Sequence, residues 1–276
     1  MFAVVSLGAV SATFPQFASG VDLVEVYATV TDARGEPVTG LTAADFRVLE
    51  DDQPQKITTF AAGDFPLAVA IGIDRSFSMR DRLATSKSAA RIFVGALRPD
   101  DQVMVIAIGS ETSAVAPLSS DHRAALAAID RLDAWGTTPL YDAALAAIDA
   151  VQAAKGRRAL VLLSDGIDRY SETTAAALIS AAREKDVLIY PIAIGGTRAP
   201  VFAELATVTG GRSFLIKDTH ELSATMTAIA RELRLQYLLG YSPAVKPSGE
   251  RQWRSITVVV DRPGVRVRAR DGYLAK

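Results

Sequence analysis

The sequence predicts an α/β fold, a doubly wound, mostly parallel sheet flanked by helices and inserted in a small β-sandwich built from both chain ends. Two observations predict it. Between residues 66 and 235, continuous apolar runs such as LAVAIGI at 67–73 alternate with segments of helical spacing, as expected of a parallel sheet buried on both faces. Toward both chain ends, apolar and polar residues alternate with a period of two, which is typical of half-buried strands.

The first part of the chain, residues 21–65, predicts β structure only. A strand is expected at 21–31, where apolar side chains alternate along the run. Two shorter strands, at 46–49 and 56–60, flank an acidic turn that contains Pro54.

The central segment predicts the alternation of strands and helices that makes up an α/β sheet. Strands are expected at 67–73, 102–108, 159–163, 187–194 and 213–216, with a short edge strand at 113–118. Helices are expected at 83–97, 123–132, 140–154, 173–184, 201–208 and 221–235.

The end of the chain returns to β structure, with strands expected at 237–241, 255–260 and 265–270. Because two or three strands at either end would bury little alone, we expect one sandwich of residues 21–65 plus 236–276 around an α/β domain of residues 66–235. Arg266, Arg268 and Arg270 share one face of the last strand, where solvated charges at a sheet edge would prevent strand addition.

Residues 1–20 are apolar and small and contain neither Lys nor Arg. They match the apolar core and cleavage region of a secretory signal but not its positively charged start, so they are predicted to be a signal-peptide remnant. The protein is then expected to be exported to the periplasm, cell surface or medium. The alternative is a cytoplasmic protein that begins with an apolar strand or helix. No segment reaches the roughly 20 apolar residues of a transmembrane helix.

Composition excludes several classes of function. Lys and Arg total 30 and Asp and Glu 31, so the formal net charge of -1 gives no basis for nucleic-acid binding. The absence of cysteine removes thiolate metal sites and cysteine nucleophiles. His122 and His220 are far apart and lack partners at ligand spacing, so surface or capping roles are expected for both.

Oxygen-bearing side chains gather where predicted strands end or helices begin. They are Asp74, Ser76 and Ser78 in a D-x-S-x-S pattern, Thr137 before a helix, and Asp165 after a strand. Each could simply cap a turn or helix. Together, two carboxylates and three hydroxyls form a hard-oxygen set suited to Mg²⁺, Mn²⁺ or Ca²⁺.

In these residues the sequence resembles the von Willebrand factor A (VWA) domain family, whose metal-ion-dependent adhesion site (MIDAS) has the pattern D-x-S-x-S, then Thr, then Asp. The resemblance covers about residues 66–235. The segments that flank these residues are similar to those of bacterial "VWFA-related" proteins, most of which are exported. The resemblance implies an intact MIDAS on a VWA fold.

The resemblance also implies how such a site is used. Ser76, Ser78 and Thr137 would hold the cation directly, and one or both of Asp74 and Asp165 would act through water. Mg²⁺ or Mn²⁺ is expected in preference to Ca²⁺, with an acidic residue of a partner protein as the last ligand. Thr138 is an alternative metal ligand to Thr137. Trp135 would either contact the partner or pack on its own loop.

The leading hypothesis is therefore a metal-dependent binding or adhesion module for a protein partner, without catalytic residues. One alternative is a metal-dependent, phosphoesterase-like hydrolase, for which Asp142 and Asp168 are the nearby candidate bases. They are otherwise expected to support the metal loops or lie on the surface. The other alternative is a structural module of an envelope assembly.

Overall fold

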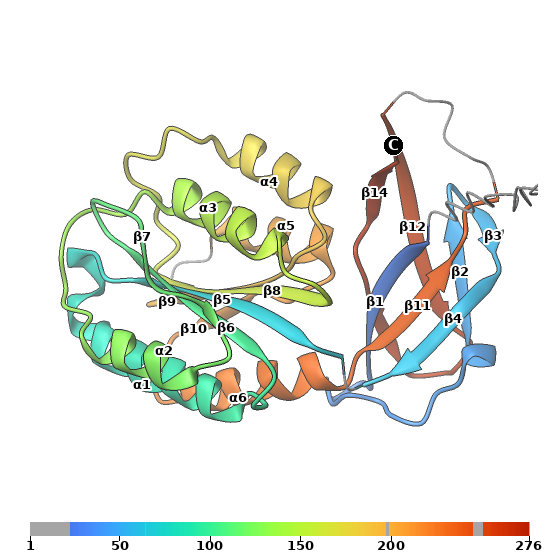
Figure 1. Cartoon of the computed structure of the whole chain (residues 1–276), viewed down its shortest axis with the longest axis horizontal. Coiled ribbons are helices and arrows are strands. Elements are labelled where there is room, and N and C mark those ends of the chain that lie inside the picture. The colour runs from blue at the N-terminus through green and yellow to red at the C-terminus, as the bar shows by residue number, and fades with distance from the viewer. Residues whose placement is uncertain (1–22, 64, 197–198, 245–250, 276) are drawn as a thin grey trace, which may run out of the picture.

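The computed structural model describes residues 23–63, 65–196, 199–244 and 251–275, and its β-strands form three sheets within those ranges (Figure 1). The predicted signal-peptide remnant, residues 1–20, lies outside the described residues. None of the helices in the described ranges is both long and apolar enough to span a membrane.

The central sheet has six strands in the order β10-β9-β8-β5-β6-β7, all parallel to their neighbours except β7, which is antiparallel to β6. The strands are β5 (Leu67–Asp74), β6 (Gln102–Ile108), β7 (Ser113–Ser119), β8 (Arg157–Ser164), β9 (Leu188–Ile194) and β10 (Phe214–Ile216). Both β6 and β8 pair with β5, so the order of winding reverses at β5. Ligands of open α/β sheets bind outside the carboxyl ends of the strands at such a reversal.

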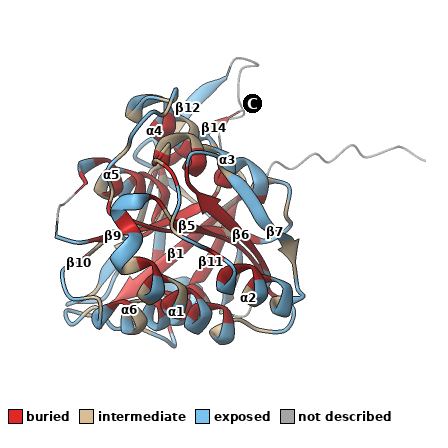
Figure 2. Ribbon diagram, turned by 90° about the vertical axis from the view of Figure 1, so that its left-hand side faces the viewer, coloured by how far each residue is buried: buried red, intermediate tan, exposed pale blue. Residues whose placement is uncertain are grey.

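Helices cover both faces of this sheet, which explains the continuous apolar runs. They are α1 (Arg80–Ala96), α2 (His122–Asp130), α3 (Leu140–Gln152), α4 (Ala175–Glu184), α5 (Pro200–Thr209) and α6 (Glu221–Arg234). The strand residues Val69 and Ile71 pack in a core with α1, α2 and α6, while Ala70 faces the core with α3, α4 and α5. Figure 2 shows the buried sheet between the two helical layers. The predicted doubly wound fold is confirmed.

Two four-stranded antiparallel sheets lie beside this α/β unit, with orders β13-β1-β11-β4 and β14-β12-β2-β3 (Figure 1). Their strands are β1 (Val24–Thr31), β2 (Phe46–Glu50), β3 (Gln53–Gln55), β4 (Ile57–Ala62), β11 (Tyr237–Tyr241), β12 (Gln252–Val260), β13 (Arg266–Arg268) and β14 (Gly272–Ala275). Strand β1 pairs with β11, and β2 with β12, so each sheet joins both ends of the chain. The division at residues 66 and 235 stays a prediction.

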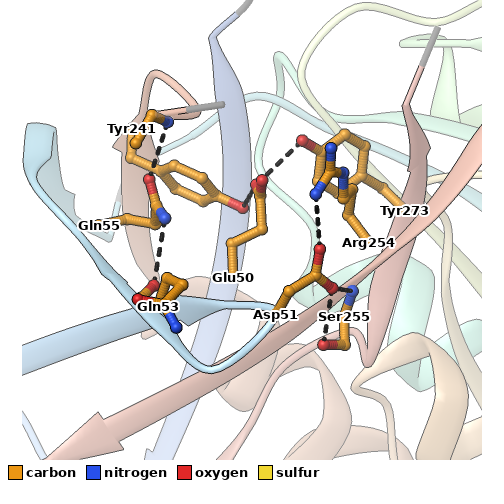
Figure 3. Close-up of polar contacts among 9 residues, drawn as sticks. Glu50, Asp51, Gln53, Gln55, Tyr241, Arg254, Ser255 and Tyr273 are labelled. Carbon is orange, nitrogen blue, oxygen red and sulfur yellow. Dashed lines mark hydrogen bonds and ion pairs between the residues drawn. The ribbon is translucent and has the colours of Figure 1, made fainter. Parts of the chain in front are cut away.

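The two antiparallel sheets share an apolar core and a polar cluster built around Glu50 of β2 (Figure 3). The buried Glu50 carboxylate accepts hydrogen bonds of 2.7 Å from the Tyr241 hydroxyl and 3.0 Å from the Tyr273 hydroxyl. Since Tyr241 belongs to the other sheet, this carboxylate ties the two sheets together. Beside it, Asp51 accepts hydrogen bonds from Arg254 and Ser255 of β12.

The last predicted strand is shorter than its alternating sequence suggests. Only Arg266–Arg268 forms β13, because the next residues leave the sheet to pack on Gly210, where a Cβ atom would lie 2.5 Å from the carbonyl carbon of Ala269. The expectation of solvated edge arginines is wrong for two of the three. Arg268 pairs with Glu232 of α6 at 2.7 Å, and Arg270 lies 3.5 Å from Asp186.

Candidate metal centre

The centre of the candidate site is Asp74, the last residue of β5. Strands β5 and β8 run in parallel with Ile73 opposite Leu163, so the next residues, Asp74 and Ser164, end neighbouring strands at the same edge. Asp74 is fully buried, and its Oδ2 accepts a hydrogen bond of 2.6 Å from the Ser164 hydroxyl. The reversal of strand order thus places a buried carboxylate at the expected ligand-binding edge.

The loop after β5 folds back on Asp74. The Oδ1 atom of Asp74 accepts a hydrogen bond of 2.9 Å from the Ser76 amide, and the Ser76 and Ser78 hydroxyl oxygens lie 3.1 Å apart. Ser78 belongs to the short 3-10 helix η2 (Phe77–Met79), which Ser76 precedes. The turn therefore brings all three polar side chains of the D-x-S-x-S pattern together.

The loop before α3 lies against this turn. The Trp135 amide donates a hydrogen bond of 2.7 Å to the Arg75 carbonyl, and the Phe77 amide donates one of 3.1 Å to the Gly136 carbonyl. Gly136 has a φ of 85°, and a Cβ atom there would lie 2.4 Å from the amide nitrogen of Ser110. Only glycine fits this close approach without strain, and it sets Thr137 directly beside the Asp74 turn.

Thr137 and its rival Thr138 have different surroundings. The Thr137 amide is held by the Ser110 hydroxyl at 3.1 Å, and its side chain is half-buried. Thr138 is buried, and its carbonyl accepts hydrogen bonds from the amides of Leu140 and Arg169 at 2.8 and 2.7 Å. Thr138 thus joins the loop to its neighbours.

The third loop follows β8 and carries Asp165. This carboxylate is 8% exposed and accepts a hydrogen bond of 3.0 Å from the Ile167 amide. Burial raises the pKa of Asp74, and the nearby charge of Asp165 acts in the same direction, while hydrogen bonds from Ser164 and Ser76 oppose the rise. The charge of Asp165 thus disfavours the ionised form of Asp74.

Within the described residues, neither Asp74 nor Asp165 forms an ion pair with a basic side chain. Arg75 instead hydrogen-bonds the Asp133 carbonyl at 3.3 Å, and Arg82 the Ser78 carbonyl at 3.2 Å. A buried, uncompensated pair of carboxylates is costly. In the same part of the chain, no three His, Cys, Asp or Glu residues cluster as metal ligands. The candidate site instead combines two carboxylates with hydroxyl oxygens, and a hard divalent cation fits such a donor set.

Asp142 and Asp168 hold the loops together. Asp168 Oδ1 accepts hydrogen bonds from the Tyr141 amide at 3.1 Å and the Ser171 hydroxyl at 2.5 Å. The Asp142 carboxylate accepts 2.9 Å hydrogen bonds from the amides of Glu172 and Thr173. These contacts fasten the loop after β8 to the start of α3, as the expected supporting role requires.

The sequence did not single out Ser164, Ser110 and Ser171 as supports of the site. Ser110 and Ser164 have partners from distant segments of the chain, and Ser171 joins Asp168 of its own loop to amides at the start of α3, so no local spacing marks these long-range contacts. For Ser164, the available signal is its position directly after a predicted strand, one residue before Asp165.

Comparisons with known proteins agree with the fold of the α/β unit. Residues 69–167 match the family model described as the von Willebrand factor type A domain. A von Willebrand factor type A structure from Catenulispora acidiphila is 16% identical, with a TM-score of 0.55 over 91% of this chain and 73% of that chain. BatB from Bacteroides thetaiotaomicron is 19% identical, with a TM-score of 0.50 over 60% of this chain and 98% of that chain.

A third structure, proximal thread matrix protein 1 from the mussel byssus, is described as having a zinc-occupied MIDAS motif. It is 18% identical, with a TM-score of 0.55 over 67% of this chain and 49% of that chain. No curated protein matches the sequence. The α/β unit thus has the VWA fold, and proteins of the VWA family are generally protein-interaction modules.

Proposed function

We propose that Asp74, Ser76, Ser78, Thr137 and Asp165 form a MIDAS that binds Mg²⁺ or Mn²⁺, and that the bound cation takes an Asp or Glu carboxylate of a partner protein. The observation that carries this proposal is the pair of buried carboxylates without a basic partner, set among hydroxyls at the carboxyl edge of the sheet. A divalent cation would offset their repulsion.

The chemistry of the donors favours binding. Ser76, Ser78 and Thr137 would supply neutral oxygens, and Asp74 and Asp165 would contribute their charge directly or through water. Neutral hydroxyls leave the cation strongly electrophilic, and Mg²⁺ readily keeps exchangeable positions in an incomplete protein cage. The partner carboxylate would fill such a position.

The hydrolase alternative has less support. It needs a base near the cation, and both candidates, Asp142 and Asp168, accept hydrogen bonds from backbone amides that organise the loops. We therefore propose a binding module without turnover, on the domain division 21–65 plus 236–276 and 66–235. The apolar residues 1–20 support a location in the cell envelope or outside the cell.

Titration calorimetry with Mg²⁺ tests the cation site. Wild type should bind the ion, and Asp74→Asn and Asp165→Asn should lose most of the heat. Asp133→Asn, which removes an exposed carboxylate from the loop that carries Trp135, is the matched control and should behave as wild type. Equal binding by all four proteins, or none by wild type, would refute the proposal.

Thermal unfolding gives an independent measurement. Mg²⁺ at a hundredfold excess over its Kd should stabilise wild type by about 2.7 kcal/mol. The metal-free Asp74→Asn protein should be at least as stable as metal-free wild type, because the substitution removes a buried charge. The oxygen of the introduced amide can still accept the Ser76 hydrogen bond, and the Ser164 hydroxyl can turn to accept from the amide nitrogen. If Mg²⁺ stabilised Asp74→Asn as much as wild type, the result would contradict the proposed metal site.

A further inference from the structure

Large apolar side chains surround the proposed metal site and face solvent. Phe77, Trp135, Ile167 and Tyr170 are 56%, 44%, 41% and 81% exposed, and we call these four residues the apolar rim. Phe77 stands between Ser76 and Ser78, and the other three lie two to five residues from Thr137 or Asp165. Of the eight large apolar side chains exposed in the described part of the chain, four are in this rim. Such clustering marks an interaction surface.

Backbone hydrogen bonds bring the three loops of the rim onto one surface. The Phe77 amide bonds the Gly136 carbonyl, next to Trp135, at 3.1 Å. The Arg169 amide bonds the Thr138 carbonyl at 2.7 Å, which places the loop of Ile167 and Tyr170 beside that of Trp135. All four side chains therefore border the same edge of the sheet as Asp74.

Tyr170 is held in a conformation that its own packing does not explain. Its φ is 70°, which is uncommon for an aromatic residue, and its side chain is the most exposed of the rim. Strained backbone of this kind concentrates at binding sites. The ring faces solvent and not the core.

Two arginines lie over rim rings and add positive charge. The guanidinium of Arg75 is 5.3 Å from the ring centroid of Trp135, and that of Arg80 is 5.2 Å from that of Phe77. Neither arginine has a carboxylate within salt-bridge distance among the described residues. The surface thus combines apolar area with cationic groups that complement an acidic partner.

We infer that this surface recognises a segment of a partner protein in which an acidic residue is flanked by apolar side chains. The acidic residue would meet the cation, so the inference rests on the proposed function, and its apolar neighbours would cover Trp135 and Tyr170. Arg75 and Arg80 favour further carboxylates close to the segment. An apolar and cationic surface would also suit an anionic membrane, so the experiment includes one.

Selection from a random-peptide display library in Mg²⁺, with elution by chelator, tests the inference. The expected peptides carry Asp or Glu beside Leu, Ile, Phe or Trp. Acidic peptides without an apolar preference would overturn the inference and leave the proposed function standing. Peptides without an acidic residue, or not released by chelator, would overturn both, and a library that yields no peptide would overturn the inference.

Rim variants then locate the contact with the selected peptide. Trp135→Ser and Tyr170→Ser should each weaken peptide binding about tenfold or more, as at interface hot spots, with Mg²⁺ affinity unchanged. The control is Trp253→Ser on β12, which is 37% exposed and lies under Arg183 at 5.8 Å. It should bind like wild type. Equal peptide affinity in all three variants would overturn the inference. So would Mg²⁺-independent binding of wild type to phosphatidylserine vesicles that both rim variants lose.

Discussion

The hydroxyl of Ser164 donates a 2.6 Å hydrogen bond to Oδ2 of Asp74, and both residues are completely buried. The Ser164 oxygen also accepts the amide hydrogen of Gly166 at 3.1 Å. One hydroxyl therefore connects the carboxylate at the end of β5 to the loop that carries Asp165. This connection fixes the orientation of Asp74 and the path of the third loop together.

Replacing Ser164 by alanine should weaken metal binding without removing a ligand. Loss of the buried hydrogen bonds should lower the free energy of unfolding by about 1–3 kcal/mol. Supporting contacts of this kind typically change metal affinity by about 10- to 100-fold. Calorimetry with Mg²⁺ and urea unfolding measure the two effects.

Ser86→Ala is the matched control for Ser164→Ala. Ser86 is also completely buried, but its hydroxyl donates to the Arg82 carbonyl within α1, at 3.0 Å. This variant should bind Mg²⁺ like wild type. Unchanged metal affinity in Ser164→Ala would show that Asp74 needs no orientation by Ser164.

The two adjacent threonines should differ in their effect on the cation. Thr137→Val removes a half-buried hydroxyl beside the Asp74 turn. Mg²⁺ affinity should fall at least about tenfold, because loss of a supporting contact alone has an effect of that size. Thr138→Val keeps the shape of a buried side chain and the carbonyl that holds Leu140 and Arg169. Its Mg²⁺ affinity should stay near that of wild type. The reverse order in calorimetry would make Thr138 the ligand.

Much of the fold could be predicted because each buried element leaves a local pattern. The run 67–73 is apolar throughout since β5 is covered on both faces. The alternation along β1 predicts a half-buried strand, and this is wrong, because Tyr27, Thr29 and Thr31 on its other face are buried as well. The short strands β3 and β14 were missed; β3 has the sequence QPQ, which contains no apolar run like that of the equally short β10. Arg268 was misread because Glu232, its partner, lies in α6, far away in sequence.

The candidate site divides in the same way. The spacing of Asp74, Ser76 and Ser78 lies within one turn, so their proximity follows from the sequence. The contacts that join this turn to Gly136 and Ser164 depend on how β5, β8 and α3 are arranged. Tyr170 has a positive φ, which an aromatic residue seldom adopts and which no sequence pattern indicates.

The strained backbone of Tyr170 should lower the stability of the protein. The left-handed conformation costs a non-glycine residue about 1–2 kcal/mol, whereas glycine adds about 0.5–1 kcal/mol of backbone entropy to folding. Tyr170→Gly should therefore leave the protein up to about 1.5 kcal/mol more stable, and Tyr170→Ser, which keeps the strained conformation, should not. Thermal unfolding of both variants checks this. A gain in the serine variant and none in the glycine variant would contradict the assignment of strain.

The ion pair between Glu232 and Arg268 joins α6 of the α/β unit to β13, and it should be strongly coupled. The Glu232 side chain is 6% exposed and also accepts a 2.9 Å hydrogen bond from the Tyr190 hydroxyl. Arg268→Met would leave this carboxylate buried without a counter-charge, at a cost of about 3 kcal/mol. Adding Glu232→Gln should restore most of the lost stability, because the amide oxygen still accepts from Tyr190 and the amide carries no charge.

Urea unfolding of the two single variants and the double variant measures the coupling between Glu232 and Arg268. Arg266→Met, on the same strand, is the exposed control. Additive losses in the double variant would mean that the two side chains stabilise the protein independently.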